Sequence, residues 1–290
     1  MRCLRASCDA SIQHTVLLAS RPAPALRHLI RHYYQVQDSL VGRVSLQPVP
    51  ARSPQILEFM FGTRYQVHRM GREVTENVRA VALVGARTCR SAELILSGTV
   101  DAFTIVFQPG AFSTLFQLPA VELTNADFDG EEVLGRRVSE LYARLGEVSA
   151  FEDRVRVADC WLTAVRPSTA SVSPIVQTAM AVVRNSGSVR ISELAHQAGL
   201  GIRQFERRFD HEIGISPKLY ARIVRFEAAL QRRAVSPTTR WTDIAHDLGY
   251  HDQMHMVHDF TRLSGDSPDV IARQLEMFVR PEVLSEKPPS

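Results

Sequence analysis

Short apolar runs of strand length occupy the first part of the chain. They lie between about Arg43 and Phe107, and glycines or a Pro-Gly pair separate them. Several short runs at this spacing, with turn residues between them, predict a small β-barrel or sandwich. The expected strands are Gln55–Phe61, Arg64–His68, Ala80–Gly85, Ala92–Ser97 and Ala102–Phe107.

The apolar period changes to that of helices after Gly110. Glu131–Leu145 and Phe151–Val165 have an apolar face at helical spacing. Two prolines and four Ser or Thr residues between Arg166 and Pro174 mark a domain boundary. The rest of the chain favours short helices as far as Leu275. The fold class is therefore α+β: a small N-terminal barrel with helices, then an all-α region. The expected divisions are a flexible tail at 1–20, an N-terminal sensory or dimerisation domain at 21–166, a linker at 167–173, a helical domain at 174–277 and a tail at 278–290.

The helical part contains an internal repeat. Leu194–Gly199 (LAHQAG) matches Ile244–Gly249 (IAHDLG) at an offset of 50 residues. Further on the offset is 51: Phe205, Phe209, Gly214 and Pro217 match Met256, Phe260, Gly265 and Pro268. One residue is inserted between the two matched blocks, and a turn tolerates such an insertion best.

Each copy of the repeat predicts a helix-turn-helix. In the first copy, Gly199 ends a helix and a second helix runs over about Ile202–His211, with Phe205 and Phe209 inward. In the second copy, Asp252 caps the helix that buries Met256 and Phe260. A long amphipathic helix with Leu219, Ile223, Phe226 and Leu230 joins the copies. Two such units can enter successive major-groove segments about 34 Å apart.

These residues resemble the AraC/XylS regulators. The first unit is carried by Ser192–Gly199, Phe205–Phe209 and Gly214–Pro217. The second, more specific match is carried by Asp243–Tyr250, Asp252, Gln253, Phe260 and Gly265–Pro268. The resemblance covers about Pro174–Leu275 and implies a seven-helix domain with two recognition helices. The protein is therefore expected to be a transcriptional regulator that binds double-stranded DNA by sequence.

The resemblance also implies which side chains face the groove: Arg203, Glu206, Arg207, Gln253, Met254, Val257 and His258. Two positions depart from the family pattern. Gly201 stands where a serine is usual, and His258 where an arginine is usual. A neutral histidine cannot make the bidentate contact that arginine makes to guanine. The second unit is therefore expected to bind more weakly, or mainly to position the protein.

Several side chains have an alternative interpretation. Arg203 and Arg207 are expected either to contact guanine or phosphate or to be ordinary exposed arginines. Glu206 is expected either to accept a hydrogen bond from cytosine or to pair with an arginine. Arg222 and Arg225 are expected to make ion pairs within the protein. His255 is expected in the core and His196 and His246 on the surface. A zinc site at His251, His255 and His258 is disfavoured because no fourth ligand is evident, so no metal and no cofactor are predicted.

The first half is similar to the N-terminal domain of a subgroup of the same regulators. Leu26–Tyr34, Pro54–Phe61, Phe107–Phe112, Leu123 and Thr124 carry this similarity. It implies a cupin-like sensory or dimerisation domain. Its aromatic side chains either line a pocket for an unknown small-molecule effector or form the domain's own core, and the core is favoured: Tyr33, Tyr34, Phe59, Phe61, Phe103 and Phe107.

Composition and charge limit the functions and locations that remain open. The net charge is +3, but residues 201–240 alone carry nine basic and four acidic side chains, which favours contact with phosphates. Four cysteines without a CxxC pair predict a reducing, cytoplasmic location, with Cys89 and Cys160 buried. No membrane span is expected. The expected partners are a second copy of the chain, in a homodimer, and RNA polymerase. No enzymatic activity is expected. Two alternatives stay open. One is an alkyl-acceptor DNA-repair enzyme with a DNA-binding tail, which is disfavoured because Cys3 and Cys8 lack partners for a zinc site. The other is an interaction module with degenerate DNA binding.

Overall fold

Two long strands organise the N-terminal part of the computed structural model, which describes residues 16–71, 74–166 and 172–275. β2 (Ile30–Val49) and β7 (Ala92–Phe107) pair along almost their whole length. β1 (Val16–Ser20) pairs with the outer edge of β2. Residues 16–20 therefore belong to the sheet, and their assignment to a flexible tail was wrong, because they complete the hydrogen bonds of an edge strand. Cys3, Cys8 and the tail expected at 278–290 lie outside the described residues.

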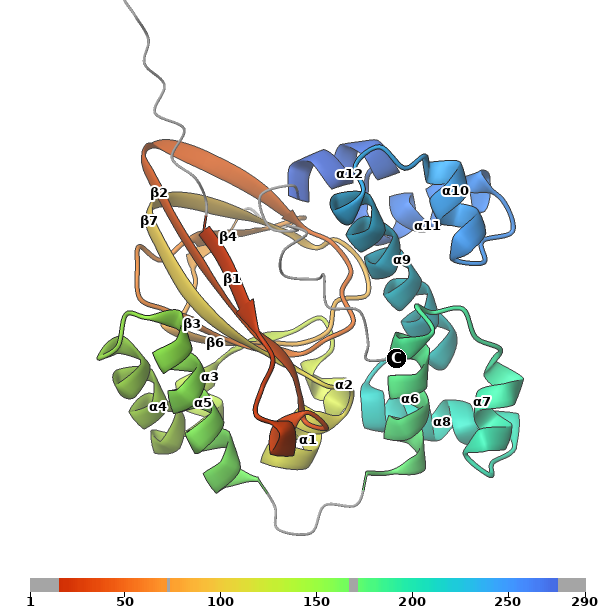
Figure 1. Cartoon of the computed structure of the whole chain (residues 1–290), viewed down its shortest axis with the longest axis horizontal. Coiled ribbons are helices and arrows are strands. Elements are labelled where there is room, and N and C mark those ends of the chain that lie inside the picture. Colours follow the sequence, from red (N-terminus) through yellow and green to blue (C-terminus); the bar gives the residue numbers. More distant parts are fainter. Residues whose placement is uncertain (1–15, 72–73, 167–171, 276–290) are drawn as a thin grey trace, which may run out of the picture.

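The other strands add to β7 in two groups. β3 (Ile56–Met60) pairs with its second half, and β6 (Val81–Val84) and β8 (Asp127–Asp129) follow β3. β4 (Gln66–Arg69) pairs with its first half and with β5 (Thr75–Asn77). Among the described strands the order β1-β2-β7-β3-β6-β8 does not return to its start. The expected closed barrel was therefore wrong: the sheet is open and strongly curved (Figure 1).

The curved sheet has a convex face covered by helices and a concave face. After the short 3-10 helix η1 (Pro24–Leu26), the covering helices are α1 (Ala111–Phe116), α2 (Ala120–Leu123), α3 (Gly130–Leu134), α4 (Arg136–Gly146) and α5 (Phe151–Val165). Glu131–Leu145 was expected as one helix, and it is broken at Gly135, whose φ is +67°. Neighbouring residues of β2 alternate between the faces, so Tyr33 is in the core under the helices while Tyr34 faces the concave side.

The helical region repeats the same pair of helices at either end of α9 (Pro217–Val235). α6 (Pro174–Arg184) precedes the first pair, α7 (Ile191–Gln197) and α8 (Ile202–Ile213). The second pair is α10 (Trp241–Asp247) and α11 (Gln253–Ser264), and α12 (Pro268–Leu275) follows it. α10 starts 50 residues after α7 and α11 starts 51 after α8. The inserted residue is in the turn between the paired helices, as the sequence predicted.

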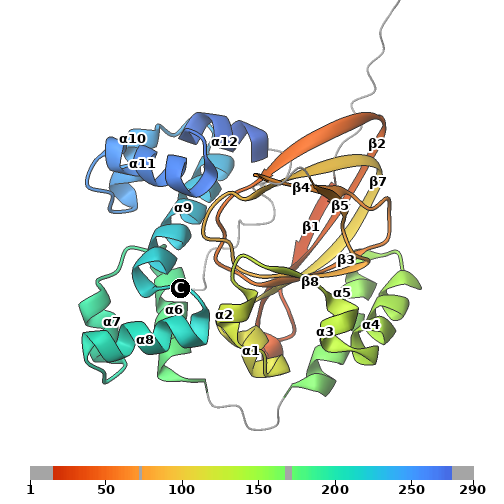
Figure 2. The same cartoon turned by 180° about the vertical axis from the view of Figure 1, so that it is seen from behind.

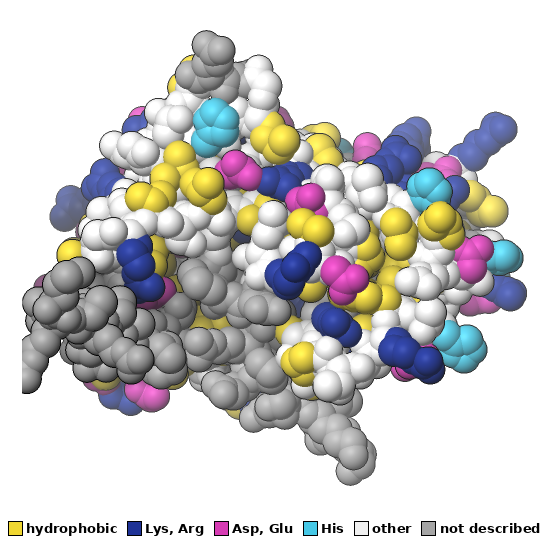
Figure 3. All heavy atoms as spheres, turned by 90° about the horizontal axis from the view of Figure 1, so that it is seen from above, with side chains coloured by type: hydrophobic (Ala, Val, Ile, Leu, Met, Phe, Trp, Pro, Cys, Tyr) yellow, Lys and Arg dark blue, Asp and Glu magenta, His cyan; other side chains and the backbone are white. Residues whose placement is uncertain are grey.

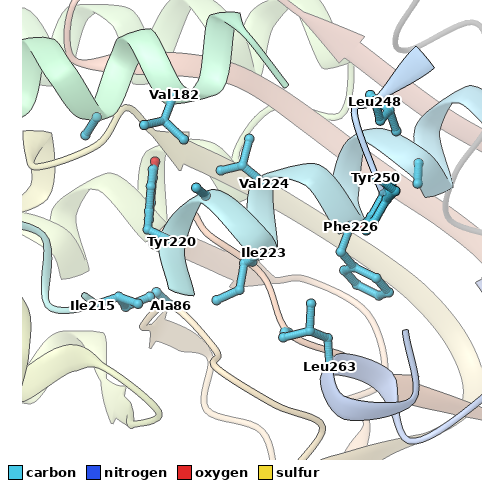
Figure 4. Close-up of a cluster of buried hydrophobic side chains, with 14 of the residues drawn as sticks. Ala86, Val182, Ile215, Tyr220, Ile223, Val224, Phe226, Leu248, Tyr250 and Leu263 are labelled. Carbon is cyan, nitrogen blue, oxygen red and sulfur yellow. The ribbon is translucent and has the colours of Figure 1, made fainter. Parts of the chain in front are cut away.

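Helix α9 supplies the core that joins both pairs. Ile223 and Phe226 are fully buried, and Tyr220, Val224 and Leu230 are nearly so. Figure 4 shows Tyr220, Ile223, Val224 and Phe226 on several sides of α9, between Val182 of α6 and Leu263 of α11. Burying large apolar side chains contributes about 1.5–3 kcal/mol each. Because one continuous core holds α9 and both pairs, the two outer faces keep a fixed spacing.

The helical region packs directly against the N-terminal sheet domain (Figures 1 and 2). Ala51 and Ala86 of the first half belong to the helical core. The end of α8 meets α2 so closely that a Cβ on Gly214 would lie 2.5 Å from the carbonyl oxygen of Ala120. Gly214 also has φ +84°, so glycine is required there twice over. At the other end, Arg90 Nη1 donates to Asp266 at 2.6 Å.

Candidate nucleic-acid interface

The outer face of α8 carries three of the predicted contact residues. Phe205 and Phe209 are fully buried, so the helix is anchored by the opposite face. Arg203, Glu206 and Arg207 are exposed. Within the described part of the chain none of these three makes a hydrogen bond or ion pair, whereas Arg208 pairs with Glu212 at 2.9 Å. Two guanidinium groups and one carboxylate are therefore available to a ligand on this face.

Helix α11 presents the other four predicted residues. Asp252 caps its start by accepting the backbone N–H of His255 at 2.7 Å, as expected. Gln253 and His258 are exposed, Met254 is 63 % exposed and Val257 is half-buried. Met256 and Phe260 anchor the inner face. The geometry of the α8 unit is therefore repeated, but the first nine residues of α11 include no arginine or lysine.

Two arginines of α9 make contacts within the protein: Arg222 forms the ion pair with the second unit that the sequence predicted, whereas Arg225 bonds to a backbone carbonyl and not to a carboxylate. Arg222 Nε donates to Asp259 of α11 at 3.0 Å, and Arg225 donates to the carbonyl of Gly187 at 2.9 Å. Asp259 is only 2 % exposed. A buried carboxylate requires such a partner, because burial without one is costly. Arg222 therefore orients the recognition helix α11, and Arg225 fixes the turn that leads into α7.

Two expectations about single residues were wrong. His255 was expected in the core but is exposed, with its ring packed edge-to-face against Tyr250 at 5.6 Å between centroids. Cys89 and Cys160 were expected to be buried but are both exposed. His196 and His246 are on the surface as expected. No group of three or more His, Cys, Asp or Glu side chains in residues 16–71, 74–166 and 172–275 has an arrangement that would hold a metal ion.

Sequence reasoning missed a cavity on the concave side of the sheet. Its volume is about 440 Å³. Apolar side chains form much of the wall, and a polar group gathers at Arg52, Glu58, Tyr65, Arg87 and Asp127. Most of the suspected aromatics are not there: Tyr33, Phe59, Phe103 and Phe107 are in the core under the helices, and Phe61 packs against it, while Tyr34 lines the cavity. Leu275 of α12 also lines it, so the cavity reaches the helical region.

Arg87 has unmet hydrogen-bonding capacity in this cavity. The side chain is buried and pairs with Asp127 through Nη2. Its Nε and Nη1, and Nε of Arg52, have no hydrogen-bond partner among the described residues. Glu58 accepts from the Tyr65 hydroxyl, and burial raises the pKa of this carboxyl despite that hydrogen bond. The polar end of the cavity therefore offers donors that suit an acceptor or an anion.

Comparison with known proteins agrees with this architecture. Residues 194–274 match the family described as a helix-turn-helix domain, and residues 19–129 match a domain of unknown function (DUF6597). The HTH-type transcriptional regulator Rv1931c of Mycobacterium tuberculosis is 38% identical over 87 residues, which are 30% of this chain. The chain spans only a third of the length of this curated relative.

Solved structures share the fold at low identity. The apo form of a lysine-to-alanine variant of ToxT from Vibrio cholerae has a TM-score of 0.50 and 8% identity, and covers 84% of this chain and 97% of that one. ToxT from Vibrio cholerae O395 has a TM-score of 0.47 and 9% identity, and covers 84% and 97%. No helix in the described part of the chain is long and apolar enough to cross a membrane.

The repeated pairs α7–α8 and α10–α11, joined by α9, define a double helix-turn-helix domain of a DNA-binding class. The chain therefore contains an AraC-type helix-turn-helix domain, which the family model matches over residues 194–274.

Proposed function

We propose that this chain is a sequence-specific transcriptional regulator that inserts α8 and α11 into two successive major-groove segments. The observation that carries the proposal is the matched outer faces of these helices, held at a fixed spacing by the buried core of α9. A helix fits the major groove and presents its outer side chains to base edges. The contact residues are those predicted: Arg203, Glu206, Arg207, Gln253, Met254, Val257 and His258.

The division of labour follows the two halves of the chain. Residues 174–277 bind DNA, residues 21–166 sense or dimerise, and 167–173 link them. A dimer doubles the contacts of two short recognition helices and so gains affinity. The regulator is not an enzyme, works in the cytoplasm and contacts RNA polymerase when bound to DNA.

Selection of duplexes from a random-sequence pool tests the DNA-binding proposal. The full chain is incubated with the pool at low salt, and bound duplexes are recovered and sequenced. The expected result is an enriched site with two short motifs about 10 base pairs apart, centre to centre. Failure to retain any duplex at low salt would remove the proposal, and a single motif of one segment would restrict it to one unit.

The concave cavity supports an effector site within the same regulator. A pocket of about 440 Å³ lies in the size range of small-molecule sites. Its buried arginine donors and apolar wall suit a small organic acid with an apolar body. Because Leu275 of α12 lines the cavity, a bound molecule would touch the helical region as well as the sheet.

Thermal stabilisation by probe acids tests the effector site. Alkyl and aryl carboxylates are compared with their uncharged amides. A ligand at a hundred times its dissociation constant stabilises a protein by about 2.7 kcal/mol. Arg87→Met is expected to abolish the stabilisation, while Arg144→Met on exposed α4 is expected to keep it. Equal stabilisation by acids and amides would remove the assignment of an anionic ligand.

A further inference from the structure

The second helix-turn-helix has an unusual charge composition. Residues 241–261, which include α10 and most of α11, contain four histidines, four aspartates and no lysine or arginine. The corresponding face of α8 carries Arg203 and Arg207. DNA is bound largely through positive charge facing its phosphates. The second unit therefore lacks a permanent positive charge of its own at the surface where the first unit has two.

Four arginines around the second unit lie beside aspartates, and a fifth lies far from the start of α11, so none of them matches the two arginines of α8 in position. Arg222 pairs with Asp259 at 3.0 Å, Arg232 with Asp247 at 3.1 Å and Arg240 with Asp243 at 3.2 Å. Arg233, which borders the hollow beside Gln253, lies 3.8 Å from Asp269 and donates to the carbonyl of Thr239. Arg262 is exposed on the last turn of α11, away from its start. With the histidines counted as neutral, residues 241–261 carry a net charge of −4 from their four aspartates.

The four histidines are all exposed. His251 begins the approach to α11 and its Nδ1 lies 3.1 Å from the carboxylate of Asp252. His255 meets the ring of Tyr250. His258 is one turn after Met254 and has no polar partner among the described residues. His246, on α10, lies 3.8 Å from Asp247. Seen from above, histidines lie at the edge of the molecule formed by the helical region, among acidic and basic side chains (Figure 3).

We propose that protonation of His251, His255 and His258 supplies the positive charge with which the second unit holds DNA, so that two-segment binding strengthens as the pH falls. This inference rests on the proposed DNA-binding function. Protonating all three changes the charge of residues 250–258 from −1, due to Asp252, to +2. The first unit, whose arginines are always charged, binds its segment at any pH in this range.

Linkage fixes the direction of the effect. A phosphate beside an imidazolium favours the charged form, so DNA binding raises the proton affinity of the histidine. Protons must then raise the affinity for DNA by the same factor. Exposed imidazoles change charge between about pH 5 and 8. Asp252 keeps its charge there, because the backbone N–H of His255, and next the side chain of His251, lower the pKa of its carboxyl.

Fluorescence anisotropy at constant ionic strength provides the test. The full chain is titrated with two duplexes from the selection described above: the complete two-segment site, and the same site with the second segment scrambled. Each histidine whose pKa rises by one unit on binding adds about tenfold in affinity. We expect at least about a tenfold tighter complex with the complete site at pH 5.8 than at pH 8, and a much smaller change with the scrambled one.

Two triple variants separate charge from other effects of acid. Changing all three to glutamine (H251Q/H255Q/H258Q) is expected to remove the pH dependence. Changing all three to arginine (H251R/H255R/H258R) is expected to give tight binding to the complete site already at pH 8, where folding is not challenged by acid. His28→Arg, on an exposed residue of the N-terminal domain, is the matched control for an added charge.

The outcomes are distinguishable. If no duplex binds at either pH, the proposed function fails and the histidine inference fails with it. If duplexes bind with the same affinity at both pH values, or if the glutamine variant keeps the full pH dependence, only the inference is overturned. The inference would also be overturned if the arginine variant bound the complete and the scrambled duplex with the same increase in affinity, because that increase would not depend on the second segment.

Discussion

Glu227 in the middle of α9 accepts two hydrogen bonds from Ser53 of the N-terminal half, one from its backbone N–H at 2.7 Å and one from its hydroxyl at 2.6 Å. Ser53 directly follows Arg52, which lines the concave cavity. Nearby, the backbone N–H of Ala51 donates to the carbonyl of Leu263 in α11. Three consecutive residues thus connect the cavity wall, the connecting helix and the second recognition helix, so the proposed effector site lies a short way from the DNA-binding helices.

Replacing Glu227 by alanine is expected to loosen this connection. Hydrogen bonds to a charged group contribute about 1.5–3 kcal/mol each, and the Ser53 groups would be left unpaired. We expect the free energy of unfolding to fall by about 2 kcal/mol and the amide hydrogen of Ser53 to exchange faster. Hydrogen–deuterium exchange and urea unfolding measure both. Glu140→Ala is the control, because it removes an exposed ion pair of α4 in which Arg136 and Glu140 are 2.9 Å apart. Its free energy of unfolding should fall by less than about 1 kcal/mol. Unchanged exchange at Ser53 would contradict the prediction.

The ion pair between Arg222 and Asp259 is expected to contribute more to the free energy of unfolding than the exposed ion pairs near it. Removing one partner of a buried pair leaves an unpaired charge and costs about 3 kcal/mol or more. Asp259→Ala should therefore strongly destabilise the helical region, whereas Asp247→Ala, which breaks an exposed pair with Arg232, should cost less than about 1 kcal/mol. Trp241 is buried beside Phe260, so its fluorescence during urea unfolding reports on this region. Equal losses in the two variants would show that burial does not set the difference.

The helical region was predictable because its signals are local. Gly199 and Gly249 adopt left-handed conformations with φ +68° and +69° at the helix ends where they were expected. The side chain of Asp252 caps α11 by accepting the backbone N–H of His255, three residues further on. The repeat doubled the evidence, since an apolar position in one unit confirmed its counterpart in the other. Each of these signals depends on a few neighbouring residues, which a sequence shows directly.

The N-terminal half was harder because its determinants are distant in sequence. β2 was missed over much of its length, since register shifts between Ile30 and His32 and between Leu40 and Val44 interrupt the alternation of apolar and polar residues. β7 was expected as two strands, but it continues through Gly98. Arg87 and Glu58 meet in one cavity only after the sheet has curved. Their positions in the sequence do not show that these two side chains lie in the same cavity.

Arg207 is expected to contribute directly to DNA affinity. Arg207→Ala should weaken binding to the selected site by about 1–3 kcal/mol, which is about 5- to 150-fold, if the guanidinium reads a base. Arg144→Ala makes the same charge change on exposed α4 and should have little effect. Arg207→Lys separates the two modes: it should retain a phosphate contact but lose the bidentate contact to guanine. Wild-type affinity of Arg207→Ala in anisotropy titrations would remove the residue from the contact set.

His32 is expected to limit stability in acid. Burial, and next the charge of Arg31, lower the pKa of His32 to about 3 from an ordinary 6.5. A lowered pKa means that the folded chain binds fewer protons than the unfolded chain below pH 6.5, so stability is complete above that pH and falls as the pH drops. The loss is at most about 1.4 kcal/mol per pH unit.

Urea unfolding at about pH 7.5, 6 and 5 measures this loss. In His32→Gln the free energy of unfolding should fall less steeply with falling pH than in the wild type. His28→Gln, which changes an exposed residue of the same domain, should show the same pH dependence as the wild type. Parallel curves for wild type and His32→Gln would assign the acid sensitivity to other groups. A flattened curve would in addition make His32→Gln the better background for measuring DNA binding in acid, because folding and imidazole protonation on α11 would then be separated.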